Sequence, residues 1–139
     1  MTNSILIQKI TDNDDVLKGA PIQSASLRLY KMACKKKDYP DIPDDYWDFM
    51  ARFNGLYYNG ATLYGLKPEI KAFPDVLKAN QNLFFNIGFD IVAIGENDMD
   101  YLIYDGDDEE FKVIAKSDET VWKHTPDFTA ALEFLLHLD

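Results

Sequence analysis

The sequence predicts an α+β fold: one domain, residues 1–139, with a twisted, mainly antiparallel sheet and helices packed around it. Three observations lead to this class. The chain of 139 residues has the usual length of a single domain. Its strand patterns are clustered and do not alternate with helix patterns, which favours antiparallel pairing. No internal repeat or low-complexity segment divides the chain.

The most strongly marked element is a helix over residues 43–53. Pro43 already has the backbone φ angle of a first helical residue and has no N–H to leave unpaired. Apolar residues then recur at helical spacing, which predicts one buried stripe. The stripe consists of Tyr46, Phe49, Met50 and Phe53. Asn54-Gly55 follows and is expected to end the helix, with Gly55 at positive φ.

A β-hairpin is expected directly after this helix. Asn59-Gly60 lies between the apolar segments 56–58 and 62–64, and this dipeptide favours a tight two-residue turn. Trp47 is offset from the helix stripe. We expect it to have a structural role, packed beneath the hairpin.

The N-terminal part of the chain adds one short and one long element. Residues 5–10 fit either a short helix or a strand, and charged turn formers end this segment. A longer helix is expected from Pro21 to Lys37, with three lysines at the carboxyl end, where cations suit the helix dipole. Its buried stripe is predicted to consist of Ile22, Ala25, Leu29, Met32 and Ala33, widened by Leu27, Tyr30 and Cys34.

The C-terminal half is expected to form a meander that a helix closes. One or two helical turns at 76–80 precede it. Alternating apolar residues predict four strands, the first of them central because both of its faces are apolar. These strands are 84–95, 101–105, 111–115 and 120–123. Thr125-Pro126 is expected to begin the last helix as its cap and first residue. Its buried stripe would consist of Phe128, Ala131, Leu132 and Leu135.

The charge balance restricts the classes of partner. The chain has 14 basic and 24 acidic residues, a net charge of −10. This charge disfavours nucleic acid and anionic membrane surfaces, both of which need a positive footprint. It is compatible with a basic protein partner, although acidity that serves solubility alone is the first explanation.

The cellular location follows from what the sequence lacks. A single cysteine, Cys34, excludes an intramolecular disulfide and suits a reducing compartment. The first residues lack the basic and apolar regions of a secretory signal, and no apolar stretch approaches the roughly 18 residues of a membrane span. We expect a cytoplasmic protein.

No residue pattern predicts catalysis, a metal site or a cofactor. The two histidines, His124 and His137, lack the spacing of metal ligands and are expected on the surface, at a strand end and a helix end. Cys34 lies in an apolar helical stripe, which favours an inert side chain. The glycine motifs of nucleotide binding and of nucleophilic serine are absent. We therefore expect a protein that is not an enzyme, with no catalytic residue, metal or cofactor.

Acidic residues are the densest polar feature. They are Asp98, Asp100, Asp105, Asp107, Asp108, Glu109 and Glu110. The calcium-loop template fails, because the sixth position counted from Asp105 is Glu110 and not glycine. The first interpretation is a solvated hairpin tip that also blocks edge pairing. A partner-binding patch comes second, and a metal site last.

Tyrosines are the other notable set in the predicted strands. They are Tyr57, Tyr58, Tyr64, Tyr101 and Tyr104. At alternating strand positions some must face outward, and exposed tyrosine is a favoured interface anchor. Core packing is the expectation for at least half of them.

Two blocks of the sequence resemble the SUKH superfamily of Smi/Knr-like proteins. The first block runs from Pro43 to Gly65, through Asn54-Gly55 and Leu63-Tyr64-Gly65, and the second runs from Ile94 to Asp105. The segment 128–136 resembles the closing helix of the family, so the resemblance covers most of 22–138. One departure is Asn97-Asp98-Met99, where relatives have a glycine-rich turn. The resemblance implies the same sheet-and-helix architecture.

The resemblance also implies a function. Fungal members regulate cell-wall glucan synthesis, and bacterial members resemble immunity proteins that bind and neutralise toxins. We therefore expect a non-enzymatic protein-binding domain, in the first place a bacterial immunity protein. The alternatives are a regulator or scaffold in cell-wall synthesis and a small-ligand-binding protein.

The expected partner is a basic protein such as a toxin domain, with no nucleic acid and no membrane. The net charge and the clustering of acids predict which residues it contacts. The predicted partner-binding residues are Tyr57, Tyr58, Glu96, Asp98, Asp100, Asp107, Asp108, Glu109 and Glu110. The identity of the partner and the oligomeric state remain open.

Overall fold

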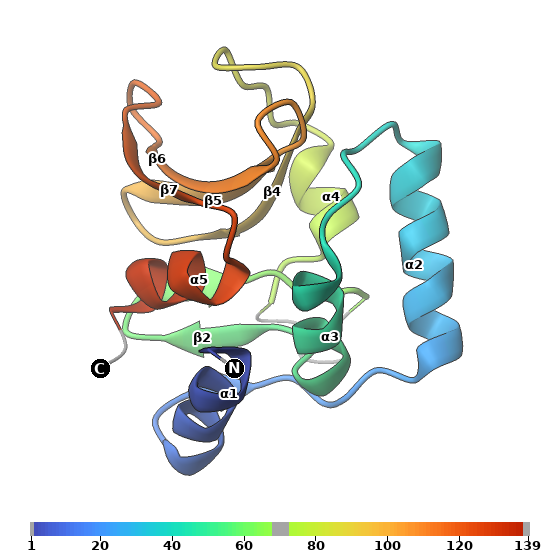
Figure 1. The fold of residues 1–139 in the computed structure, drawn as a ribbon, viewed down its shortest axis with the longest axis vertical. Helices are drawn as coiled ribbons and strands as arrows, with labels where there is room; N and C mark the ends of the chain where they lie inside the picture. Colours follow the sequence, from blue (N-terminus) through green and yellow to red (C-terminus); the bar gives the residue numbers. More distant parts are fainter. Residues whose placement is uncertain (1, 68–72, 138–139) are drawn as a thin grey trace.

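A computed structural model describes residues 2–67 and 73–137, which form helices packed around one sheet (Figure 1). The α+β class is confirmed. The helices are α1 Thr2–Asp12, α2 Ser24–Lys36, α3 Asp44–Arg52, α4 Val76–Asn80 and α5 Phe128–Leu136. The strands are β1 Leu17–Lys18, β2 Leu56–Tyr58, β3 Ala61–Leu63, β4 Ile91–Glu96, β5 Asp100–Asp105, β6 Glu110–Ala115 and β7 Val121–Thr125.

The sheet follows the chain. Its strand order is β1 to β7 without a crossover, and every pair is antiparallel. The β4–β7 part curls strongly, and α5 lies against one of its faces (Figure 1). Residues directly opposite each other share a face of the sheet. Leu102 and Val113 therefore lie on the α5 face, whereas Tyr101 and Ile114 lie on the opposite face.

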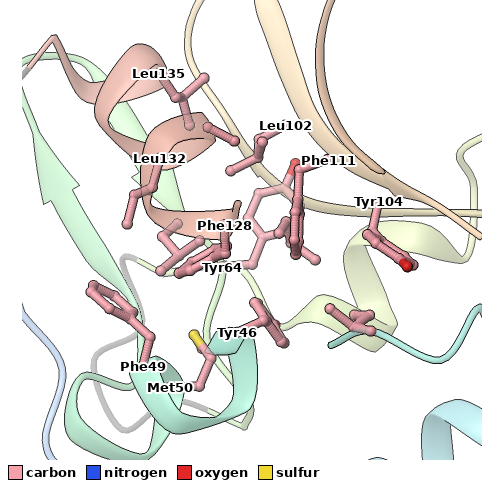
Figure 2. Close-up of a cluster of buried hydrophobic side chains, with 14 of the residues drawn as sticks. Tyr46, Phe49, Met50, Tyr64, Leu102, Tyr104, Phe111, Phe128, Leu132 and Leu135 are labelled. Carbon is pink, nitrogen blue, oxygen red and sulfur yellow. The ribbon is translucent and has the colours of Figure 1, made fainter. Parts of the chain in front are cut away.

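The core is centred on Phe128, the first residue of α5 (Figure 2). Its ring lies 5.4 Å from that of Tyr46, 5.3 Å from that of Phe49 and 5.4 Å from that of Phe111. These rings come from α3 and β6, and all four side chains are fully buried. Aromatic pairs at such separations add to the stabilisation that burial itself provides. The predicted stripes of 43–53 and of the last helix are therefore confirmed as core.

Two glycine-containing turns are confirmed. Gly55 follows α3 with φ +97°, and a Cβ added there would lie 2.7 Å from a ring carbon of Phe73. In the β2–β3 hairpin Asn59 has φ +53° and Gly60 has φ +85°. Both residues of this turn therefore have the left-handed backbone that a two-residue hairpin requires.

The predicted buried stripe of α2 is wrong in part. Ala25, Leu29 and Met32 are exposed, Leu29 by 66% and Met32 by 53%, whereas Cys34, which was expected to widen the stripe, is buried. The face toward the body also contains Tyr30, whose hydroxyl donates to Asp75 Oδ1 at 3.0 Å. Both faces have apolar residues at helical spacing, so the periodicity alone could not select the one that docks. The docked face is the one that brings the Tyr30 hydroxyl to the Asp75 carboxylate.

The strand predicted over 84–95 begins only at Ile91. The preceding residues form an irregular loop. The Glu119 carboxylate holds this loop in place by accepting the N–H groups of Asn86 at 2.9 Å and Ile87 at 2.8 Å. These N–H groups therefore bond to a side chain and not to a neighbouring strand. Phe84 and Phe89 in this loop are exposed.

Smaller corrections concern caps and strand ends. Pro43 caps α3 and is not its first residue, and Asp127 caps α5 by accepting the Thr129 N–H at 3.0 Å. The last strand extends to Thr125. Trp47 is buried as expected, but its indole N–H donates to the Ile42 carbonyl at 3.0 Å.

Candidate functional site

One end of the β4–β7 sheet meets the carboxyl end of α5 and encloses a hollow of about 260 Å³. We call it the Trp122 hollow. Its lining consists of Asn97, Asp100, Val113, Trp122, Phe134, Leu135 and His137. It lies on the α5 face, because its sheet residues alternate with Tyr101 and Ile114 of the opposite face.

The turn between β4 and β5 fixes one side of the hollow. The Asn97 side-chain oxygen accepts the N–H groups of Met99 at 3.0 Å and Asp100 at 2.8 Å. Asparagine commonly closes turns in this way. The Met99 carbonyl accepts the Lys116 N–H at 2.8 Å, which ties this turn to the end of β6. Asp100 therefore starts β5 in a well-defined position.

A β-bulge positions Trp122. Val113 pairs with Lys123 and Ile114 pairs with Val121, so Trp122 has no residue opposite it on β6. Bulges redirect side chains in this manner. The Trp122 indole N–H donates to Asp100 Oδ1 at 3.1 Å, yet the side chain is 59% exposed. The ring is thus anchored at one edge and open to solvent.

Two features of the hollow carry negative charge. Asp100 contributes a carboxylate, and α5 ends beside it at the C-cap His137. A helix carries partial negative charge at its carboxyl end. Lys116 follows β6 but sends its ammonium group to the opposite face, where it lies 2.6 Å from Glu96 Oε1 and 4.9 Å from the centre of the Tyr101 ring.

Of the predicted partner-binding residues, Asp100 lines the hollow and Asp98 is exposed in the adjoining turn. Glu96 is near in sequence but lies on the opposite face. Its carboxylate accepts from the Tyr64 hydroxyl and from Lys116, both at 2.6 Å. Burial and the bond to Glu96 raise the pKa of the Tyr64 hydroxyl. Glu96 therefore joins strands and a turn within the fold.

The predicted acidic loop lies at the other end of β5. A strand of six residues separates it from Asp100 by about 17 Å. Lys112 binds Asp105 at 3.0 Å and also binds Asp108, and Glu110 lies 3.1 Å from the His124 ring nitrogen. Asp107 and Glu109 are exposed. The acids thus form two separate groups and not one surface.

The tyrosines predicted as anchors lie on a different part of the sheet from the two acidic groups. Tyr57 and Tyr58 are on β2, three strands from β5, at whose two ends the acidic groups lie. Tyr57 is exposed and Tyr58 is half-buried against the core. Of the other three, Tyr64 and Tyr104 are buried and Tyr101 is half-buried.

The apolar part of the site was not predicted from the sequence. Met99 is 70% exposed and follows Asp98 directly before Asp100, while Phe134 is 38% exposed in the lining of the hollow. The tryptophan in a short terminal strand and the methionine in a polar turn were the available signals. The bulge that turns Trp122 outward depends on the pairing of β7 with β6, which no local pattern reveals.

A second, larger hollow lies between α2 and the segment that precedes it. Its volume is about 730 Å³. Apolar residues such as Ile22, Leu29 and Leu66 line it together with polar ones, and among the described residues the charged ones in its lining are Lys18 and Lys67. The Asn54 side chain closes one side by exchanging hydrogen bonds with the Leu66 backbone at 2.6 and 3.1 Å.

The described residues show neither a metal centre nor a bilayer-spanning helix. Within residues 2–67 and 73–137, no three His, Cys, Asp or Glu side chains are grouped so that they could hold a metal ion. Over the same ranges every helix is too short or too polar to cross a bilayer. His124 and His137 are exposed at a strand and at a helix end, as predicted.

Comparisons with known proteins found no match to a family model, a curated protein or a solved structure. The resemblance of the two sequence blocks to the SUKH superfamily therefore stays a prediction.

Proposed function

We propose that this domain is a non-enzymatic protein-binding module whose binding surface is centred on Trp122. The observation that carries the proposal is a tryptophan that is 59% exposed while its indole N–H remains bonded to Asp100. Tryptophan is among the residues that most often dominate binding energy. An anchored ring also loses little freedom on binding, which lowers the cost of association.

The surroundings of Trp122 support a protein partner. Met99 and Phe134 add exposed apolar surface at the hollow. Interfaces are enriched in aromatic residues and methionine and have a polar rim. Asp98 and Asp100 supply such a rim here, with negative charge.

The partner that fits this surface is a basic protein. The chain has a net charge of −10, and complementary charge mainly speeds association. The exposed acids Asp107 and Glu109, at the far end of β5, would add to this attraction without contacting the Trp122 surface.

In its most specific form, the proposal is that the domain is a bacterial immunity protein that neutralises a toxin. The sequence resemblance and the negative charge support this form. The domain itself would catalyse nothing. By covering a basic surface of the toxin, it would block access to the active site of the toxin.

Co-expression tests this proposal. A toxin domain encoded beside the gene of this protein would be produced in a bacterial host with and without the domain. We expect the native chain to restore growth and Trp122→Ala to restore much less. Phe89→Ala, which removes a fully exposed aromatic ring from the loop before β4, is the matched control and should restore growth fully.

Two results would count against the proposal. If Trp122→Ala protects the host as well as the native chain does, the Trp122 surface is not the binding surface. Failure of the native chain to protect or bind would remove the immunity role, and the cell-wall regulator would then become the form to test.

The hollow beneath α2 favours small-ligand binding as a second candidate function. Its volume of about 730 Å³ lies within the range of roughly 300–1,000 Å³ that is usual for ligand pockets. Apolar walls with Lys18 and Lys67 suit a molecule that has an apolar body and an anionic end. Decanoate should then raise the melting temperature, whereas decanol should not. Lys18→Gln should reduce that shift, and equal shifts with both compounds would exclude the anionic end.

A further inference from the structure

We infer that the Trp122 hollow receives one arginine side chain of the partner, an inference that rests on the proposed protein-binding function. The guanidinium would bind the Asp100 carboxylate and lie against the Trp122 ring. This names the chemical group that the surface recognises, in addition to its location.

The aromatic walls are the first support. Trp122 and Phe134 both line the hollow, from the sheet and from α5. A cation over an aromatic face is attracted by the ring, most strongly for tryptophan, and arginine makes such contacts more often than lysine. A flat guanidinium also stacks on the indole, which a rounded ammonium group does not.

Asp100 is the second support. Its Oδ1 accepts the indole N–H at 3.1 Å, and no donor of the described residues is bonded to Oδ2. A carboxylate has about four acceptor positions and commonly binds a guanidinium through both of its oxygens. Asp100 can therefore keep the Trp122 bond and still bind the cation. The two contacts would be made to one group, since Trp122 and Asp100 are already joined.

Size and charge exclude other occupants. A hollow of about 260 Å³ is smaller than the roughly 300–1,000 Å³ of usual small-molecule pockets, so it suits a single side chain. The Asp100 carboxylate and the carboxyl end of α5 disfavour an anion. A neutral apolar side chain would leave Oδ2 buried without a donor, which is costly.

Blocked tripeptides that differ in one side chain provide the test. The Trp122 indole N–H signal would be followed by NMR during titration with Gly-Arg-Gly, Gly-Lys-Gly and Gly-citrulline-Gly, each blocked at both ends. Citrulline keeps the shape of arginine without its charge. The indole signal of the buried Trp47 is an internal control, and Trp122→Phe assigns the two signals.

We expect a saturable shift of the Trp122 signal with the arginine peptide, weaker binding of the lysine peptide and no shift with the citrulline peptide. Asp100→Asn keeps an acceptor for the indole N–H and removes the charge. It should weaken arginine binding by about tenfold or more, as for a hydrogen bond to a charged group. Asp14→Asn removes the same charge from the exposed segment after α1 and should change binding by less than about twofold, as for a solvent-exposed charge.

Specific outcomes overturn the inference. These are equal shifts with the arginine and citrulline peptides, no shift of Trp122 at the highest soluble concentration, or unchanged binding by Asp100→Asn. Nuclear Overhauser contacts from the Trp122 ring to Val113 and Phe134 that are the same in the free Asp100→Asn variant and the native chain show that the ring has kept its position. Failure of the proposed function has a different signature: the peptide binds at Trp122, but Trp122→Ala protects the host against the toxin as well as the native chain.

Discussion

The side chain of Asn80 pairs with the backbone of Ala93 as a neighbouring strand would. Asn80 Oδ1 accepts the Ala93 N–H at 2.8 Å, and Nδ2 donates to the Ala93 carbonyl at 2.8 Å. On this side of β4 the strand β3 pairs only with Gly95 and Glu96. A buried side-chain amide at the end of α4 thus continues the ladder where β3 has ended. Asn54 pairs with Leu66 in the same way.

Replacing Asn80 with alanine should destabilise the domain strongly. The change leaves a buried N–H and a buried carbonyl of Ala93 without partners, and we expect a loss of about 2–4 kcal/mol in unfolding free energy. Urea denaturation measures this loss. Asn82→Ala, two residues on and exposed, should change stability by less than about 0.5 kcal/mol. Similar losses for the two variants would show that the Ala93 pairing contributes little.

Gly55 and Gly60 separate backbone strain from steric contact. Both have positive φ, but a Cβ at Gly55 meets Phe73 at 2.7 Å, whereas a Cβ at Gly60 has no described atom within 4 Å. Gly60→Ala should cost about 1–2 kcal/mol through strain alone. Gly55→Ala should cost about 1–3 kcal/mol more because Phe73 must move. Thermal unfolding of both variants gives the difference, and equal losses would mean that Phe73 adapts freely.

Stability should fall at alkaline pH through Cys34. Burial and the nearby Asp75 raise the pKa of this thiol from 9.0 to about 11. Below pH 9 the thiol is protonated in both states and its contribution is fully present. As the pH rises from 9 toward 11, the unfolded chain loses this proton first and the contribution is lost.

Cys34→Val tests this dependence, because valine keeps an apolar side chain and cannot ionise. Burial also raises the pKa of Tyr30, Tyr46 and Tyr64 above the usual 10.0, so these tyrosines act mainly above pH 10. The comparison is therefore made between pH 9 and 10 by urea denaturation. The native chain should lose more stability over this interval than the variant, and parallel curves would contradict the assignment to Cys34.

The acidic turn between β5 and β6 should act on association and not on dissociation. Asp107→Asn with Glu109→Gln removes two exposed charges. With a basic partner, this should slow association and flatten its salt dependence, since such charges act at long range over a Debye length of about 8 Å at physiological ionic strength. Surface binding kinetics at several salt concentrations measure both effects.

The control for this variant is Trp122→Ala. It should mainly speed dissociation, at a cost of about 2 kcal/mol or more if Trp122 is a hot spot. If the double charge variant leaves the association rate and its salt slope unchanged, the turn is only a solvated hairpin tip.

Elements that local chemistry determines were predictable from the sequence. The helix 43–53, its end at Gly55 and the Asn59-Gly60 turn each depend on residues within one segment. The face of α2 that docks on the body could not be predicted, since two apolar stripes fit the same helical spacing. The loop 84–90 was missed for a related reason, because Glu119, about thirty positions away, binds its backbone.

The candidate site followed the same division. Acid density along the chain drew attention to Asp98 and Asp100 but could not show which acids are already paired. Glu96 with Tyr64 and Asp105 with Lys112 are pairs that appear only once the strands are aligned. Predicting the position of Trp122 would also require the exact register of β6 and β7, because Trp122 lies at a one-residue shift between these two strands.

The order of the strands in the sheet has a kinetic consequence. Because β1 to β7 pair in chain order, each new pairing joins neighbours in sequence and closes the shortest loop available. Sheets with such local contacts fold faster than those with distant pairings. The hairpin of β5 and β6, with six paired positions, is a natural place to begin. The docking of α5 is then expected to be the slow step of folding, because the contacts of Phe128 with Tyr46 and Phe49 close a loop of about eighty residues.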